Sequence, residues 1–181
     1  TKLLKSAWHN NYMDGGILMN EGLYTAKVLS SLKKVFSDEE PRYEPECNVL
    51  TALKNETVSF QVAYNSSNRY IVHGRVEVES PIKYHIRVRK VVEVPASLCC
   101  HPVVDDNYLR TKPGLYPDLL TDLEDGKITF VAGHWQSLWV DIEVTEDMEA
   151  GEYPIKLKFF NHEGQEVCSA ETSVTIFDAV L

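Results

Sequence analysis

The stretch from Gly133 to Val144 reads GHWQSLWVDIEV and contains the clearest strand pattern in the chain. Its aliphatic residues occupy every second position, at Leu138, Val140, Ile142 and Val144. This alternation predicts a half-buried β-strand and places Trp139 on the polar face with Asp141 and Glu143. A sheet buries its aliphatic face first, so we expect Trp139 to contact something other than the domain's own core. Its partner would be a sugar, another chain or a second domain.

The same period of two recurs along most of the chain after Cys47. It predicts further strands within residues 58–64, 72–78, 84–94, 128–132, 153–160 and 167–177. Turns rich in Gly and acidic residues separate the later strands, and stretches with a helical period are nearly absent. This pattern predicts an all-β fold, a two-sheet antiparallel β-sandwich of immunoglobulin-like or jelly-roll-like topology.

The domain organisation that we expect is simple. Residues 1–22 are polar and rich in turn residues, which predicts an irregular N-terminal arm. Residues 23–181 form the β-sandwich domain in this interpretation. Within it, Leu23 to Phe36 fits both a helix and a strand. We found no internal repeat and no low-complexity linker.

A segment between two predicted strands, from Ala96 to Lys127, is rich in Pro, Asp and Gly. We expect it to be a loop, and long loops of this kind usually have a function or serve contacts outside the domain. Its candidate binding residues are Asp105, Asp106, Tyr108, Arg110, Tyr116 and Asp118.

Composition excludes several classes of protein. The chain has 181 residues, 18 basic and 27 acidic side chains, and a net charge of −9. Nucleic-acid binding is disfavoured, because phosphate contacts need clustered Lys and Arg. No apolar run reaches the roughly 18 residues that span a membrane. The four cysteines form no CxxC pair, so we predict free thiols and no metal site.

No arrangement of residues predicts a reaction. Cys99, Cys100 and His101 are neighbours in sequence, whereas a catalytic thiol and its base are normally brought together by the fold. The acidic residues are scattered over turns and outer strand faces, so no pair of them is predicted to act on a sugar. We therefore predict no catalytic residue and no cofactor. Gln61 is a binding candidate, because it faces away from the aliphatic stripe that contains Phe60.

Several motifs resemble those of a known family, in the same order along the chain. Asn55-Glu56 followed by Ser59-Phe60-Gln61 resembles the "NExxSFQ" segment of glycoside hydrolase family 123 and the related domain-of-unknown-function family 4091. Further matches to the family's segments are SLKKVF at 31–36 with Pro41, LYPDLL at 115–120, QSLWV at 136–140 and AGEY at 150–153. Three positions depart from the family's pattern, at Lys33, Ser37 and Leu119. Together the motifs cover most of the chain from about Ser31.

The resemblance implies that this chain is the N-terminal β-sandwich of a bacterial glycoside hydrolase, cytoplasmic or secreted. Family members carry their catalytic carboxyl groups in a (β/α)8 barrel that follows the sandwich, so no catalytic residue is transferred to this chain. The expected partner is that downstream barrel in the same polypeptide, with a glycan as a further possible ligand. The predicted contact surface comprises Trp139, Gln61, Tyr116, Asp118 and Trp135.

Two other functions are compatible with the residues. A carbohydrate-binding module would stack Trp135, Trp139 and loop tyrosines on sugar rings. An extracellular immunoglobulin-like interaction domain would need no small ligand, and fold class does not exclude it.

Overall fold

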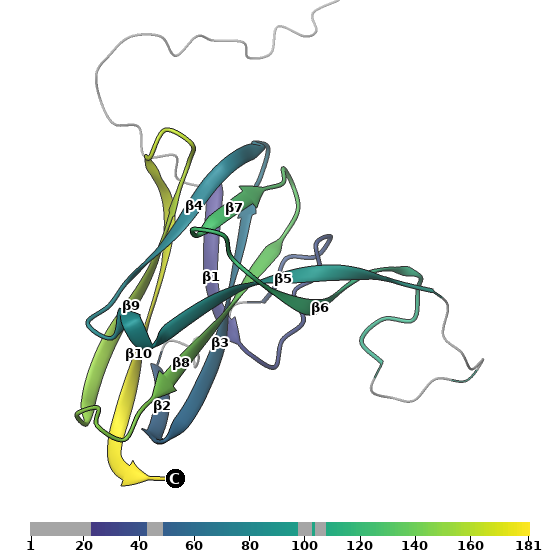
Figure 1. Cartoon of the computed structure of the whole chain (residues 1–181). Coiled ribbons are helices and arrows are strands. Elements are labelled where there is room, and N and C mark those ends of the chain that lie inside the picture. The colour runs from purple at the N-terminus through teal and green to yellow at the C-terminus, as the bar shows by residue number, and fades with distance from the viewer. Residues whose placement is uncertain (1–22, 43–48, 98–102, 104–107) are drawn as a thin grey trace, which may run out of the picture.

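A computed structural model describes residues 23–42, 49–97, 103 and 108–181. Within these described residues, ten strands form two five-stranded sheets that pack face to face, as Figure 1 shows. The predicted all-β sandwich is therefore confirmed. The predicted arm at residues 1–22 lies outside the described residues, as do Cys47, Cys99, Cys100 and His101.

Sheet A has the strand order β1, β3, β8, β5, β6. These strands span Tyr24–Ser30 (β1), Glu56–Ser66 (β3), Gln136–Val144 (β8), Ile86–Ala96 (β5) and Gly114–Asp122 (β6). All neighbours in this sheet are antiparallel. The ambiguous segment after Leu23 thus begins as an edge strand, because its β-branched and aromatic residues pair with β3.

Sheet B has the strand order β2, β10, β9, β4, β7. Its strands span Val49–Lys54 (β2), Glu166–Val180 (β10), Gly151–Phe160 (β9), Ile71–Glu79 (β4) and Lys127–Phe130 (β7). A single turn of 3-10 helix, η2 (Lys83–His85), precedes β5. Strands β10 and β2 pair in parallel, whereas the other pairs in this sheet are antiparallel. The described residues include no helix that is long and apolar enough to cross a membrane.

The loop that we expected between Ala96 and Lys127 is partly a strand. Strand β6 pairs with β5 over most of its length, and the β5–β6 hairpin extends beyond the body of the sandwich as an arm (Figure 1). A register shift lies opposite Val92 and Glu93, whose partners are Leu119 and Pro117. Asp118 is therefore the extra residue of a β-bulge. Pro117 and this bulge interrupt the alternation that would have marked β6 in the sequence.

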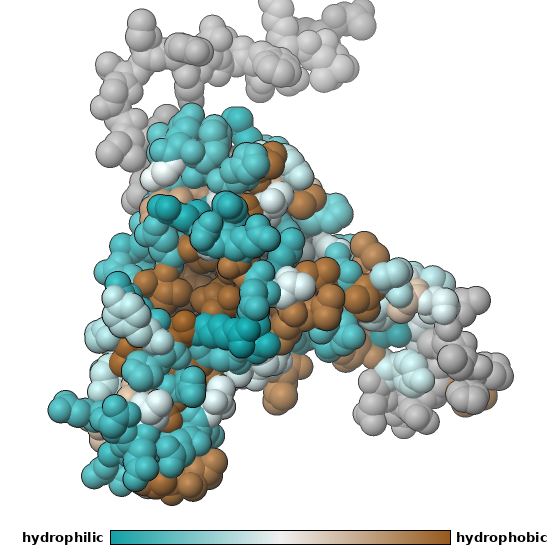
Figure 2. Space-filling model, viewed as in Figure 1, coloured by the Kyte–Doolittle hydropathy of each residue, from teal (hydrophilic) through white to brown (hydrophobic). Residues whose placement is uncertain are grey.

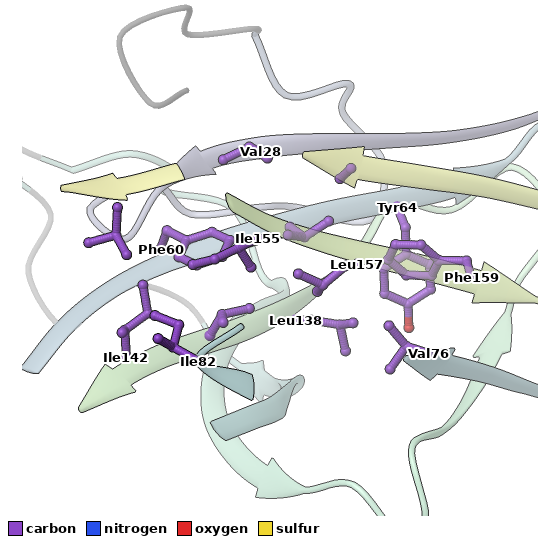
Figure 3. Packing of buried hydrophobic residues seen from close by; sticks show 14 of the residues in the cluster. Val28, Phe60, Tyr64, Val76, Ile82, Leu138, Ile142, Ile155, Leu157 and Phe159 are labelled. Carbon is purple, nitrogen blue, oxygen red and sulfur yellow. The ribbon is translucent and has the colours of Figure 1, made fainter. Parts of the chain in front are cut away.

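Aromatic and aliphatic side chains from the facing sheets form the core. Phe130 is fully buried, and its ring packs against Tyr24, Tyr64 and Phe159 at centroid distances of 5.5, 5.1 and 6.1 Å. Figure 3 shows Phe60, Leu138, Leu157 and Phe159 interleaved between the two layers. The core buries the side chains that point inward from both sheets. The surfaces left to contact other molecules are therefore the outer faces of the sheets and the arm.

Candidate functional site

The outer face of sheet B is covered by charged side chains that pair across strands. Lys156 lies 2.7 Å from Glu171, and Lys158 pairs with Glu79. The carboxylates in these pairs are about two-thirds exposed. Exposed ion pairs of this kind contribute little free energy and are typical of a face that meets water. The candidate functional surfaces therefore lie on sheet A and on the arm that extends from it.

On sheet A, Gln61 is not available to a partner. Its side chain is only 3% exposed. The Nε2 group donates hydrogen bonds to the backbone oxygens of Ser30, Ser31 and Lys33, at 3.3, 3.2 and 2.6 Å. The prediction that Gln61 belongs to a contact surface is thus corrected, because the residues after β1 fold over it. Its role in this structure is to hold the turn at residues 30–33.

That turn leads into a covering segment, residues 31–41, which crosses the outer face of sheet A. Val35 and Phe36 anchor it, since both are buried. The backbone N–H of Trp135 donates to the carbonyl of Ser37 at 2.9 Å, and the Ser37 N–H donates to the Glu93 carboxylate at 3.3 Å. The covering segment therefore ties β1 to the far strands of the sheet.

Trp135 packs beneath this covering segment. It contacts a small core of Leu29, Val35 and Ala63, and the ammonium group of Lys27 lies 5.0 Å from the centre of its ring. The indole is half-buried and is already engaged by its own chain. Its availability for stacking on a sugar is correspondingly reduced.

Trp139 lies on the outer face of sheet A and takes part in a polar network around Asp141. The register places it between Gln61 of β3 and Arg89 of β5. Its indole N–H donates to the Asp141 Oδ1 at 2.7 Å, and the Ser59 hydroxyl donates to the same oxygen at 2.7 Å. Arg89 forms an ion pair with the other oxygen. Trp139 is half-buried and does not lie between the sheets, so it keeps the outward position predicted from the alternation.

The charge of Asp141 is stabilised by this network. Burial would raise the pKa of its carboxyl group, but hydrogen bonds from Ser59, Trp139 and Arg89, together with the positive charge of Arg89, more than offset burial and lower the pKa. Asp141 is therefore a carboxylate at neutral pH. The hydrogen bond to Asp141 occupies the indole N–H of Trp139. The faces of its aromatic rings therefore remain the part of Trp139 that can contact another molecule or domain.

Replacing Asp141 with asparagine is expected to lower the free energy of unfolding by roughly 1–2 kcal/mol at neutral pH, since the charge of Arg89 loses its partner. Because the folded-state pKa of Asp141 is lowered, its contribution is complete above the unfolded-state value of about 4 and is lost as the pH falls through the lower folded-state value. Urea unfolding of both proteins at about pH 7 and about pH 2.5 measures the difference.

The control for this prediction is Asp122→Asn. Asp122 pairs with Arg87 at 2.7 Å, but its side chain is 70% exposed. We expect that variant to change stability by less than about 0.5 kcal/mol at either pH. An Asp141→Asn effect of the same size at both pH values would contradict the role given to the carboxylate.

A cleft of about 640 Å³ lies where the covering segment meets the β5–β6 arm. Its apolar wall consists of Phe36, Val94, Ala96, Leu109, Tyr116 and Pro117. Lys34, Arg110 and Asp118 provide charged groups, and Tyr108 adds a second tyrosine. Figure 2 shows hydrophobic residues gathered along the arm. The cleft thus brings together four residues of the predicted loop, Tyr108, Arg110, Tyr116 and Asp118, whereas Asp105 and Asp106 lie outside the described residues.

The aromatic side chains in the wall of the cleft are held by contacts within the chain. The ring of Tyr116 meets Phe36 edge to face at 5.7 Å, and its hydroxyl donates to the carbonyl of Lys112. The guanidinium carbon of Arg110 lies 3.6 Å from the centre of the Phe36 ring. Arg110 also pairs with Asp38 at 2.6 Å and with Glu39 at 2.9 Å, and its hydrogen bond lowers the pKa of Asp38. These contacts fix the aromatic rings before any ligand arrives.

Two residues that line the cleft, and one exposed residue outside it, were not predicted as binding candidates. Lys34 and Phe36 reach the cleft from the covering segment, and Leu32 is 91% exposed on the turn that Gln61 holds. The motif SLKKVF contains all three, but its sequence does not show that it would cross the sheet. Among the described residues, no group of three or more His, Cys, Asp or Glu side chains is arranged to hold a metal. Cys168 is a free thiol, and burial raises its pKa to about 12.

The chain is similar to known proteins in structure but not in sequence. No protein-family model matches the chain. No curated protein matches its sequence. Among solved structures, a family 123 glycoside hydrolase from Clostridium perfringens superposes with a TM-score of 0.65 and 10% identity, over 87% of this chain and 28% of the hydrolase.

A family 4466 protein of unknown function from Parabacteroides merdae gives a TM-score of 0.44 at 10% identity, over 86% of this chain and 45% of that protein. AvmM, a macrocyclization catalyst of alchivemycin A biosynthesis, gives a TM-score of 0.43 at 10% identity, over 85% of this chain and 88% of AvmM. Neither likeness is close enough to compare sites. The chain is therefore similar in fold to a part of a family 123 glycoside hydrolase and spans less than a third of that enzyme's length.

Proposed function

We propose that this chain is a non-catalytic accessory domain of a glycoside hydrolase and that it packs against a downstream catalytic domain. The observation that carries the proposal is the likeness in fold, which covers 87% of this chain but only 28% of the family 123 enzyme. A sandwich that matches so small a share of an enzyme is suited to a supporting role. The collinear motifs from Ser31 onward support the same family.

The carboxyl group of Asp141, on the outer face of sheet A, is not suited to act as the general acid of glycoside hydrolysis. Glycoside hydrolysis needs a carboxylic acid whose pKa is raised so that it can donate a proton near neutral pH. Asp141 has the opposite property, because its pKa is lowered by its hydrogen bonds and by Arg89. Its carboxylate is engaged in orienting Trp139 and pairing with Arg89.

The surface proposed to meet the catalytic domain comprises Trp139 and Leu32. Gln61 is the register partner of Trp139, and it holds the turn that carries Leu32. Leu32 therefore belongs to a turn that lies over the same outer face as Trp139. A leucine that is 91% exposed and an outward, half-buried tryptophan are apolar groups that a partner domain would shield from water.

Activity measurements on the complete polypeptide test this proposal. We expect the complete protein to hydrolyse at least one member of a panel of aryl glycosides, whereas residues 1–181 alone hydrolyse none. Absence of glycosidase activity in the complete polypeptide, or activity in residues 1–181 alone, would refute the proposal.

A further inference from the structure

We infer that the cleft between the covering segment and the β5–β6 arm binds a neutral sugar ring. It is a different surface from the one around Trp139, so a single domain would have one face for its neighbour and one cleft for a glycan. The choice of a glycan as ligand rests on the proposed function, but the chemistry of the cleft supports it independently.

The size and shape of the cleft fit a small ligand. A volume of about 640 Å³ lies within the range of pockets that bind small molecules. Tyr116 is held at both ends, by the ring of Phe36 and by the carbonyl of Lys112. Tyr108 lines the same cleft and is 48% exposed. Aromatic rings with fixed positions offer apolar faces on which the C–H face of a sugar can stack at little entropic cost.

The polar groups at the mouth of the cleft suit hydroxyl groups. The Lys34 ammonium lies 3.8 Å from the Asp118 carboxylate, and these side chains are 47% and 72% exposed. The Lys34 ammonium also donates to the Pro117 carbonyl at 3.0 Å, but it has three hydrogens and its ion pair with Asp118 is loose, so both groups still have capacity for a ligand. A hydroxyl group can donate to Asp118 and accept from Lys34, because it is both donor and acceptor. An aliphatic side chain from a partner protein could satisfy neither group.

The charge balance favours a neutral ligand. Arg110 is already neutralised by two carboxylates, Asp38 and Glu39. Lys34 faces Asp118, so together with these ion-pair partners the cleft presents no net positive charge. An acidic sugar would therefore gain no net electrostatic attraction there. The β-bulge at Asp118 turns this side chain out of the regular strand alternation, which is a common device for aiming a residue at a ligand.

Isothermal titration calorimetry of the 181-residue chain with cellohexaose, maltohexaose and chitohexaose tests this inference. We expect saturable binding of at least one of these neutral hexaoses, with a Kd on the order of 0.1–1 mM. Hexagalacturonate, which is acidic, should bind no more tightly than the neutral hexaoses. Failure of all three neutral hexaoses to bind would overturn the inference.

Two variants locate the binding. Tyr108→Ala removes an exposed ring of the cleft, and Asp118→Asn removes the carboxylate at its mouth; both side chains are exposed enough that the fold should persist. We expect each to weaken binding about tenfold. Tyr84→Ala is the matched control, because Tyr84 is 90% exposed within η2 and is not part of the cleft. Unchanged affinity in both cleft variants, or an equal loss in Tyr84→Ala, would overturn the assignment.

The outcomes separate this inference from the proposed function. If the 181-residue chain binds no hexaose but the complete polypeptide is an active glycosidase, the inferred sugar site is wrong and the proposed accessory role stands. If the 181-residue chain binds a hexaose but the complete polypeptide has no glycosidase activity, the carbohydrate-binding cleft is supported and the proposed glycoside hydrolase is refuted.

Discussion

Replacing Gln61 with leucine is expected to lower the free energy of unfolding by about 2–3 kcal/mol and to loosen the covering segment. Leucine is similar in size but cannot donate hydrogen bonds to the three backbone oxygens that Gln61 contacts. Its loss would also free the turn that carries Leu32. Urea unfolding gives the stability change, and limited proteolysis should show cleavage within residues 31–41 before the rest of the domain is cut.

A suitable control is Gln165→Leu. Gln165 lies in an exposed turn and pairs with Asn161, so its replacement should change stability by less than about 1 kcal/mol. If Gln61→Leu were as stable as this control and equally resistant to protease, Gln61 would not be what holds the covering segment in place.

Truncating Phe130 to alanine should have the largest effect of any change proposed for this domain, about 3–5 kcal/mol. Phe130 is fully buried and contacts three other aromatic rings. It belongs to β7, a strand of four residues at the edge of sheet B. A strand this short depends on its side chain in the core, so we expect β7 to lose hydrogen-exchange protection before its neighbours do.

Phe177→Ala provides the comparison for Phe130. Phe177 is 50% exposed on β10, so its truncation should cost less than about 1 kcal/mol. Thermal or urea unfolding of both variants gives the two values. Equal destabilisation by the two substitutions would mean that the aromatic cluster around Phe130 does not hold the sheets together.

The sequence predicted the sandwich well because most strands bury one face. Alternation assigned Trp139 to the outer face correctly, and the same rule put Gln61 on that face. The two residues nevertheless differ in exposure. Gln61 is buried by residues 31–41, which come from a different part of the chain, and no local pattern reports such a crossing. Alternation gives the face of a sheet, but not what covers it.

The arm shows a second limit of local patterns. Strand β6 was expected to be part of a loop, because Pro117 and the bulge at Asp118 break the period of two. Its pairing depends on β5, whose residues lie about twenty to thirty positions earlier in the sequence. The candidate residues Tyr116 and Asp118 were identified in the sequence, but the cleft that joins them to Lys34 and Phe36 follows only from the crossing of the covering segment.

Oxidative footprinting by hydroxyl radicals tests the proposed packing most directly. It compares side-chain oxidation in residues 1–181 alone with that in the complete polypeptide, and Tyr84, which is 90% exposed, provides the internal standard. If the outer face of sheet A packs against a catalytic domain, Trp139 and Leu32 should be several-fold less oxidised in the complete polypeptide while Tyr84 is unchanged. Equal oxidation of Trp139 and Leu32 in both proteins would contradict the proposed interface.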